Sequence, residues 1–204
     1  IIQELDEILK WDPPHLSLYI LTTKEKYIHQ KALPQDEWIE REYLEVSEYL
    51  TSKGYNHYEV SNFSKPGYES RHNLKYWSAE SVAGIGPSAS GFLFEKSIRY
   101  KWKNKQRIYD VENLNPKQLR LEKLYLKLRT DKGINGREFF QGKELESFLT
   151  LKKSWDNKGL LKTSQASTAQ PDKDYNDAEV VLNSKGMLQM DFFIDEVFRF
   201  AQDL

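Results

Sequence analysis

The stretch GYNHYEVSNFSKPGYESRHNLKYW, residues 54 to 77, carries most of the information about the fold. Gly54 follows a helical pattern and supplies the left-handed residue that often ends a helix. Residues 57–63 are β-prone and predict a strand. A Pro-Gly turn then leads to His72-Asn73-x-x-Tyr76-Trp77. Imidazole can ligate a metal and aromatic rings can pack on a flat ligand, so these six residues form the first candidate site.

The residues on either side of this stretch predict a mixture of helices and strands. Apolar residues at helical spacing predict a helix over 2–9, which the sequence Trp-Asp-Pro-Pro then ends. Alternation predicts a strand over 15–20, and a long amphipathic pattern predicts a helix over 36–53. The glycine-punctuated segment 82–94 reads as strand, tight turn and strand, and 97–102 as a further β segment. These elements predict an α/β fold.

From Arg107 onward the pattern is mostly helical. Helices are expected over 116–130, 137–140, 143–157 and 185–202. Segments 160–163 and 179–182 could pair as a two-stranded wing, and the polar residues between them are rich in turn formers. The order of these elements is typical of a winged-helix domain. We therefore expect two units, residues 1–106 and residues 107–204.

Composition limits the function classes. The 204 residues contain no Cys, which excludes disulfides and a thiolate-held iron–sulfur cluster within them. The net charge of −1 argues against a dedicated nucleic-acid binder. A mean hydropathy of −0.73 and the lack of a long apolar run argue against a membrane span, so a cytoplasmic location is expected. The first residue is Ile1 within a helical pattern, and we expect the chain to be part of something longer.

Four strings occur in a recognisable order: PPHLSLYILT at 13–22, the stretch 54–77, GIGPSASG at 84–91 and LRTDKGI at 128–134. Together they resemble the coproporphyrinogen III oxidase-like radical SAM proteins, most of all the HemW branch of haem chaperones. The tail resembles the HemN C-terminal domain. This resemblance implies the closing part of a radical SAM partial TIM barrel with its sheet extension, followed by a winged-helix-like domain.

One departure from the family pattern matters for chemistry. In the family, a CxxxCxxC triad holds a 4Fe–4S cluster that cleaves S-adenosylmethionine, and this triad is absent here. The resemblance therefore implies that this chain alone does not run radical chemistry. It also implies that the missing N-terminal half of the barrel is a partner.

The resemblance gives the HNxxYW motif a role in haem binding. His72 would be the axial, metal-ligating residue, Asn73 would orient the imidazole or a propionate, and Tyr76 and Trp77 would stack on the porphyrin. The alternative is structural. In that interpretation these residues pin a loop onto the sheet, with Trp77 in the core.

The resemblance also implies a remnant of the S-adenosylmethionine or substrate pocket. Its expected residues are Thr22, Glu59, Gly84, Gly86, Ser88 and Ser90. Each has a plainer interpretation: Glu59 could be an edge-strand charge facing water, and the glycine segment could be a tight turn between packed strands.

Three functions remain open from the sequence. The first is the haem-binding portion of a haem chaperone, with haem or porphyrin and a haem-receiving protein as partners. The alternative is a fragment of an oxygen-independent coproporphyrinogen III oxidase. The third is a winged-helix module that binds another protein or a nucleic acid. Because the barrel edge would lack its neighbours, the isolated chain is expected to be marginally stable, oligomeric or aggregation-prone.

Overall fold

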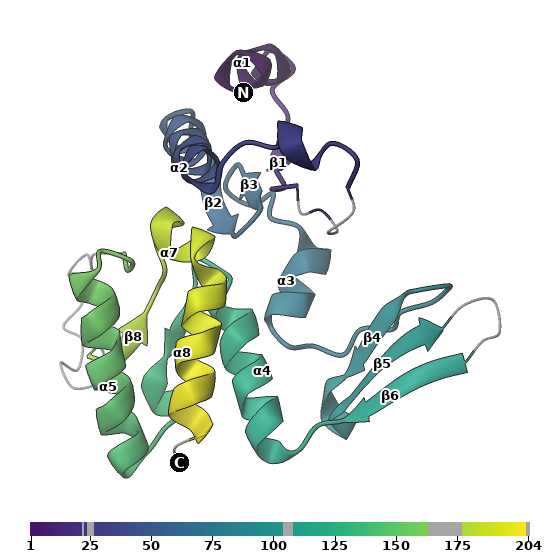
Figure 1. The fold of residues 1–204 in the computed structure, drawn as a ribbon, viewed down its shortest axis with the longest axis vertical. Helices are drawn as coiled ribbons and strands as arrows, with labels where there is room; N and C mark the ends of the chain where they lie inside the picture. The colour runs from purple at the N-terminus through teal and green to yellow at the C-terminus, as the bar shows by residue number, and fades with distance from the viewer. Residues whose placement is uncertain (22, 24–26, 104–107, 163–176, 203–204) are drawn as a thin grey trace.

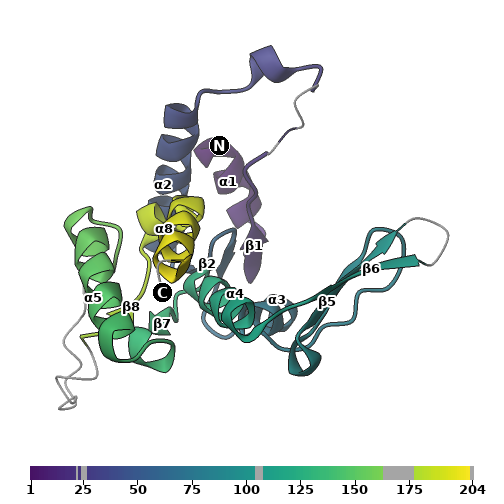
Figure 2. The same cartoon turned by 60° about the horizontal axis from the view of Figure 1, so that its bottom comes forward.

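The structure is a computed structural model that describes residues 1–21, 23, 27–103, 108–162 and 177–202. It is a mixed α/β protein, as the sequence predicts (Figure 1). A three-stranded sheet and two helices form the N-terminal part, a second three-stranded sheet extends to one side, and a group of helices forms the C-terminal part (Figures 1 and 2). No helix among the described residues is long and apolar enough to cross a membrane.

The first sheet joins three short antiparallel strands in the order β1-β3-β2. Helix α1 and the long helix α2 precede its hairpin, and α2 ends where Gly54 takes a φ of +87°. The element bounds are α1 (Ile2–Leu9), β1 (His15–Ser17), η1 (Gln30–Ala32), α2 (Asp36–Ser52), β2 (Asn56–Glu59) and β3 (Asn62–Ser64).

Two strand predictions in this sheet are wrong in their extent. Residues 57–63 are not one strand, because the chain turns at Val60 and Ser61 to form the β2–β3 hairpin. The Glu59 carboxylate accepts hydrogen bonds from the Ser61 backbone N–H and the Asn62 side chain, which satisfies the polar groups of that turn. The strand predicted over 15–20 ends at Ser17.

The second sheet is an antiparallel meander of β4 (Ser90–Leu93), β5 (Ile98–Lys103) and β6 (Ile108–Asn113), with η2 (Phe94–Lys96) in its first turn. The expectation that the chain becomes helical at Arg107 is wrong for 108–113, because these residues pair with β5. The expected boundary between 106 and 107 therefore falls between two paired strands. In the predicted strand–turn–strand at 82–94, Val82 makes only a single bridge to Phe92.

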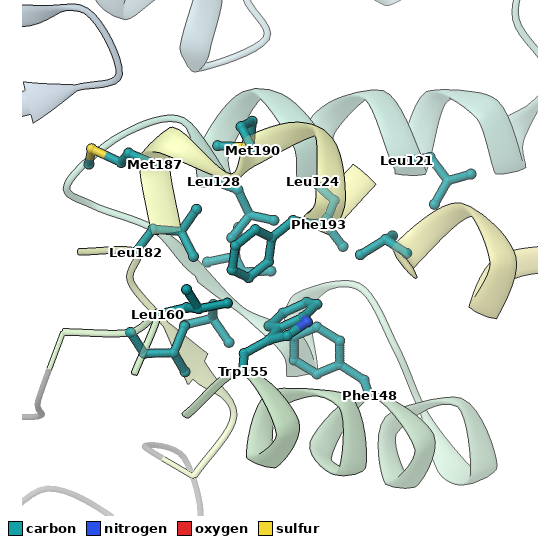
Figure 3. Close-up of a cluster of buried hydrophobic side chains, with 14 of the residues drawn as sticks. Leu121, Leu124, Leu128, Phe148, Trp155, Leu160, Leu182, Met187, Met190 and Phe193 are labelled. Atoms are coloured by element: carbon teal, nitrogen blue, oxygen red, sulfur yellow. The ribbon is translucent and has the colours of Figure 1, made fainter. Parts of the chain in front are cut away.

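The C-terminal part packs helices around the core shown in Figure 3. Its elements are α4 (Pro116–Leu128), β7 (Ile134–Asn135), η3 (Gly136–Glu138), α5 (Gly142–Asn157), β8 (Glu179–Val180), α7 (Ser184–Leu188) and α8 (Met190–Gln202). The last predicted helix is thus two helices. The predicted wing is reduced to a bridge between Leu161 and Leu182, while β8 pairs with β7. Most of the polar insert lies outside the described residues.

A short edge joins the C-terminal part to the first sheet. The Val60 N–H donates to the Arg129 carbonyl at 3.2 Å, and the Asp131 N–H donates to the Tyr58 carbonyl at 2.9 Å. Thr130 lies between them, opposite Glu59 in an antiparallel bridge. Part of the LRTDKGI string therefore extends the sheet beyond β2.

Candidate functional site

The HNxxYW motif lies on a helix, α3 (Arg71–Trp77), which the sequence analysis did not predict. Ser70 begins the helix, since its hydroxyl accepts a hydrogen bond from the Asn73 backbone N–H at 3.3 Å. In a helix, residues four apart share a face. The motif therefore divides into two pairs, His72 with Tyr76 and Asn73 with Trp77.

The first pair faces outward. Both side chains are exposed, with Tyr76 at 37%. The two rings meet edge to face, with their centroids 4.9 Å apart. An exposed imidazole beside an exposed phenol ring can present a nitrogen to a metal and an aromatic surface to a flat ligand.

The second pair faces the body of the protein. The Asn73 side chain hydrogen-bonds the Tyr58 hydroxyl, which also accepts the Ser70 N–H at 3.2 Å and meets the His15 Nε2 at 2.8 Å. Burial raises the pKa of Tyr58, so this phenol remains protonated. The Trp77 ring lies under the Arg129 guanidinium, 4.7 Å from the ring centroid to the guanidinium carbon. Asn73 and Trp77 thus attach the helix.

The structure therefore does not bring the four expected haem-contacting residues onto one surface. Because α3 is a helix, His72 and Tyr76 lie on one face and Asn73 and Trp77 on another. The interpretation that the motif pins the chain to the sheet describes the inner pair, with a helix in place of the expected loop. Trp77 is half-buried rather than a core residue.

Glu59 is buried, with 1% of its surface exposed, so the interpretation as an edge charge facing water is wrong. Burial raises the pKa of its carboxyl, while hydrogen bonds from Asn62 and Ser61 and the positive charge of Arg129 oppose that rise. Asn62 in turn accepts a hydrogen bond from the Ser17 hydroxyl. This carboxylate belongs to the interior of the first sheet and its hairpin turn.

The glycine segment packs against the second sheet. The Gly84 N–H donates to the Tyr100 hydroxyl at 3.0 Å, and the Trp102 indole N–H donates to the Gly84 carbonyl at 2.9 Å. A Cβ at Gly84 would lie 2.2 Å from the Ser90 carbonyl oxygen, so the close approach requires glycine here. The backbone that Gly84 approaches is that of Ser90, the first residue of β4.

The other expected pocket residues lie just after Gly84 in the chain. Gly86 and Ser88 have positive φ angles of +104° and +67°. Ser88 and Ser90 are exposed, and Ser90 pairs with Lys101 in the sheet. The turn interpretation accounts for these conformations. Thr22 lies outside the described residues.

Two pockets border these elements. One of about 580 Å³ lies between the end of β1 and α2, with a mainly apolar lining that includes Leu18, Tyr19 and Trp38. Another of about 430 Å³ lies between the end of α3 and the LRTDKGI segment, and includes Trp77 and Lys132 in its lining. Two motifs of the sequence therefore meet at one place.

Arg129 and Tyr58, which contact α3, were not predicted as site residues. Both lie inside strings quoted for their resemblance, but neither carries a local signal for this contact. Within the described residues, no group of three or more metal-ligating side chains could hold a metal ion.

Comparison with known proteins agrees with the resemblance. The chain is 38% identical over 105 residues to the "Heme chaperone HemW" of Lactococcus lactis, covering 48% of this chain and 27% of that protein. It is 28% identical over 191 residues to HemW of Bacillus subtilis, covering 80% and 48%. The match to HemW of Escherichia coli is 36% over 91 residues, covering 43% and 24%.

This chain is a homologue of the HemW proteins. It matches between 24% and 48% of the length of these three relatives. The chain matches no protein-family model.

Among solved structures, the fold matches a protein described as coproporphyrinogen III oxidase (HemN) from Escherichia coli, a radical SAM enzyme. The TM-score is 0.67 at 13% identity, and the match covers 98% of this chain and 50% of that one. At this identity the comparison establishes a shared fold. The expected resemblance to HemW- and HemN-like proteins is thereby confirmed.

Proposed function

We propose that this chain is the haem-binding portion of a HemW-like haem chaperone, with His72 as the axial ligand of the haem iron. One observation carries the proposal: His72 and Tyr76 form an exposed pair on α3, with ring centroids 4.9 Å apart. The named haem chaperones among its relatives give this pair its ligand class.

The exposed position of His72 and Tyr76 suits a ligand that is later transferred to another protein. A neutral imidazole nitrogen can bond to haem iron, and a neighbouring phenol ring can contact the porphyrin. Because both side chains are exposed, haem on this face would remain accessible to a haem-receiving protein. A deep pocket would bind haem more tightly and release it more slowly.

The chemistry of the cluster does not fit this chain. A 4Fe–4S cluster needs thiolate ligands, and the 204 residues contain no Cys. We therefore assign no radical or S-adenosylmethionine step to these residues and propose that they are not an enzyme by themselves.

We also propose how these residues sit in a longer protein. β1 would be the closing strand of a radical SAM partial barrel, and β2 and β3 its extension. The helices α4, α5, α7 and α8 would belong to a winged-helix-like domain. The apolar side chains of Tyr19, Leu21 and Trp38, exposed by 75%, 64% and 44%, would then be covered by the rest of the barrel.

A fragment of a coproporphyrinogen III oxidase is the second candidate. The fold match to HemN favours it, although at 13% identity that match does not extend to activity. The two candidates differ in ligand: an oxidase fragment would prefer the metal-free porphyrinogen, whereas a haem chaperone would prefer the iron complex through His72.

The test is a haemin titration followed in the Soret region. His72→Ala should lower the affinity at least about tenfold, equivalent to about 1.4 kcal/mol, because the iron loses its protein ligand. His29→Ala is the matched control: His29 is also exposed and its ring lies 5.6 Å from that of Tyr27, edge to face. This variant should bind haemin like the wild type.

Two outcomes would contradict the proposal. Equal loss in both variants would mean that haemin binds any exposed imidazole. Equal affinity of the wild type for haemin and for iron-free coproporphyrin would remove the role of the iron and favour the oxidase fragment.

A further inference from the structure

Helix α3 has little to hold it in place. It is seven residues long, and none of its side chains is fully buried. A helix this short is not stable by itself, because one turn fixes many dihedral angles for few hydrogen bonds. Its position must come from contacts with its neighbours.

The contacts of its inner face lie near its two ends. Ser70 and Asn73 meet the Tyr58 hydroxyl near the beginning of the helix. At its end, the Trp77 ring lies against Arg129. Figure 1 and Figure 2 show that the end of α4, where Arg129 lies, approaches α3.

Arg129 is itself well fixed. Its Nη1 donates to the Tyr125 hydroxyl at 2.7 Å, and its guanidinium carbon lies 5.4 Å from the Tyr125 ring centroid and 4.7 Å from that of Trp77. Its backbone carbonyl accepts the Val60 N–H at the sheet edge. The guanidinium therefore lies near two aromatic rings, and the backbone that carries it is hydrogen-bonded to the first sheet.

Part of this contact is shielded from water. The Arg129 Nε is buried, and in the described part of the chain it has no hydrogen-bond partner; the same holds for the Trp77 indole nitrogen. A cation shielded from water interacts more strongly with an aromatic ring than an exposed one does. Buried Glu59 adds a carboxyl group whose pKa responds to the charge of Arg129.

We propose that Arg129 is the positioning residue of α3: by holding Trp77, it fixes the helix so that His72 and Tyr76 face outward together. Arg129 would act through the helix, since its side chain contacts Trp77 of that helix. The consequence for haem rests on the proposed function, whereas the consequence for the helix does not.

The test compares Arg129→Met with Arg129→Lys and Lys132→Met in the full chain. Met keeps an aliphatic side chain and removes the charge. Lys keeps the charge without the planar guanidinium that lies near both rings. Lys132 lies in the same string with its side chain 83% exposed, so Lys132→Met makes the same change in net charge without touching Trp77.

Two measurements separate the helix from the ligand. Hydrogen exchange of the amides of residues 71–77 should become about tenfold faster in Arg129→Met, intermediate in Arg129→Lys and unchanged in Lys132→Met. Haemin affinity should fall about tenfold in Arg129→Met and recover in part in Arg129→Lys.

The two measurements separate failure of this inference from failure of the proposed function. If wild-type protein does not bind haemin, the proposed function fails, and the exchange of α3 alone decides the role of Arg129. Unchanged exchange in Arg129→Met would overturn the inference, as would equal acceleration in Lys132→Met. If Arg129→Met does not fold, Trp77→Leu breaks the same contact from the other side and should accelerate α3 in the same way.

Discussion

The two ends of the molecule bury their apolar residues very differently. The C-terminal cluster joins side chains from α4, α5, β8, α7 and α8, with Trp155, Phe148 and Phe193 fully buried at its centre (Figure 3). The N-terminal cluster is small and is built around Leu5 and Leu50 of α1 and α2. Around it Trp11 and Leu21 remain largely exposed.

This difference shows where stability resides. A large cluster can stabilise its helices by itself, because buried apolar area supplies most of the free energy of folding. A small cluster beside exposed apolar side chains stabilises its elements less and suits a surface that is covered in a longer protein. We therefore expect the N-terminal elements to open before the C-terminal ones.

The largest effect is expected in the C-terminal core. Trp155→Ala should lower the free energy of unfolding by about 3–5 kcal/mol, because it removes a fully buried indole that packs on Phe193 and donates to Glu196 at 2.5 Å. Urea denaturation followed by circular dichroism measures this. Trp11→Ala, at a side chain 87% exposed, is the control and should change it by less than about 0.5 kcal/mol. If the two substitutions lowered the free energy of unfolding equally, the C-terminal cluster would not be the main source of stability.

The next effect concerns the junction between the two ends. The His57 ring stacks on Phe63, 4.1 Å between centroids, and its Nδ1 contacts the hydroxyls of Ser47 and Ser184. Burial lowers the pKa of His57 to about 4 from 6.5. Between pH 6.5 and pH 4 the unfolded chain therefore binds a proton at His57 that the folded protein does not bind. The stability that the neutral histidine allows above pH 6.5 is lost as the pH falls toward 4.

This loss should reach about 3.5 kcal/mol well below pH 4, because the pKa falls from 6.5 to about 4 and each pH unit is worth about 1.4 kcal/mol. Glu59 works in the opposite direction, because its raised pKa lets the folded protein take up a proton more readily. Urea unfolding between pH 7 and pH 4 measures the sum, and His57→Gln isolates the histidine. If the slope of stability against pH is the same in His57→Gln, the histidine has no such role.

The smallest effect is expected in the N-terminal cluster. Leu5→Ala should cost about 2 kcal/mol, at the low end for a buried leucine, because its small cluster can partly collapse around the gap. Hydrogen exchange should show faster opening of α1 with α4 and α5 unchanged. Ile8→Ala, at a side chain 43% exposed on the same helix, is the control. Acceleration throughout the chain would mean that the two clusters unfold as one.

The sequence predicted the long helices well. α2 and α5 differ by one residue from their predicted bounds, because a long amphipathic pattern with a glycine after it is a strong signal. The β2–β3 hairpin was missed since its turn, Val60 and Ser61, contains neither Gly nor Pro, the residues that mark a turn most strongly. β6 was missed because pairing with β5, rather than a local pattern, determines that strand.

The candidate site was predicted in part. The motif HNxxYW was found, but its division into an outer and an inner pair depends on α3 being a helix. Seven residues with no fully buried side chain give too little periodicity to predict a helix. The partner of Trp77 is Arg129, more than fifty residues further along the chain, and no local pattern predicts such a contact.

The short edge that adds Arg129, Thr130 and Asp131 to the first sheet has a consequence for insertions and deletions. The bridge between Thr130 and Glu59, with the backbone hydrogen bonds on either side of it, fixes which residue lies opposite which. A single inserted or deleted residue before Thr130 would place a charged neighbour opposite Glu59 and turn the guanidinium away from Trp77. We therefore expect homologous chains to vary in length elsewhere, and to keep the number of residues between the end of α4 and β7 constant.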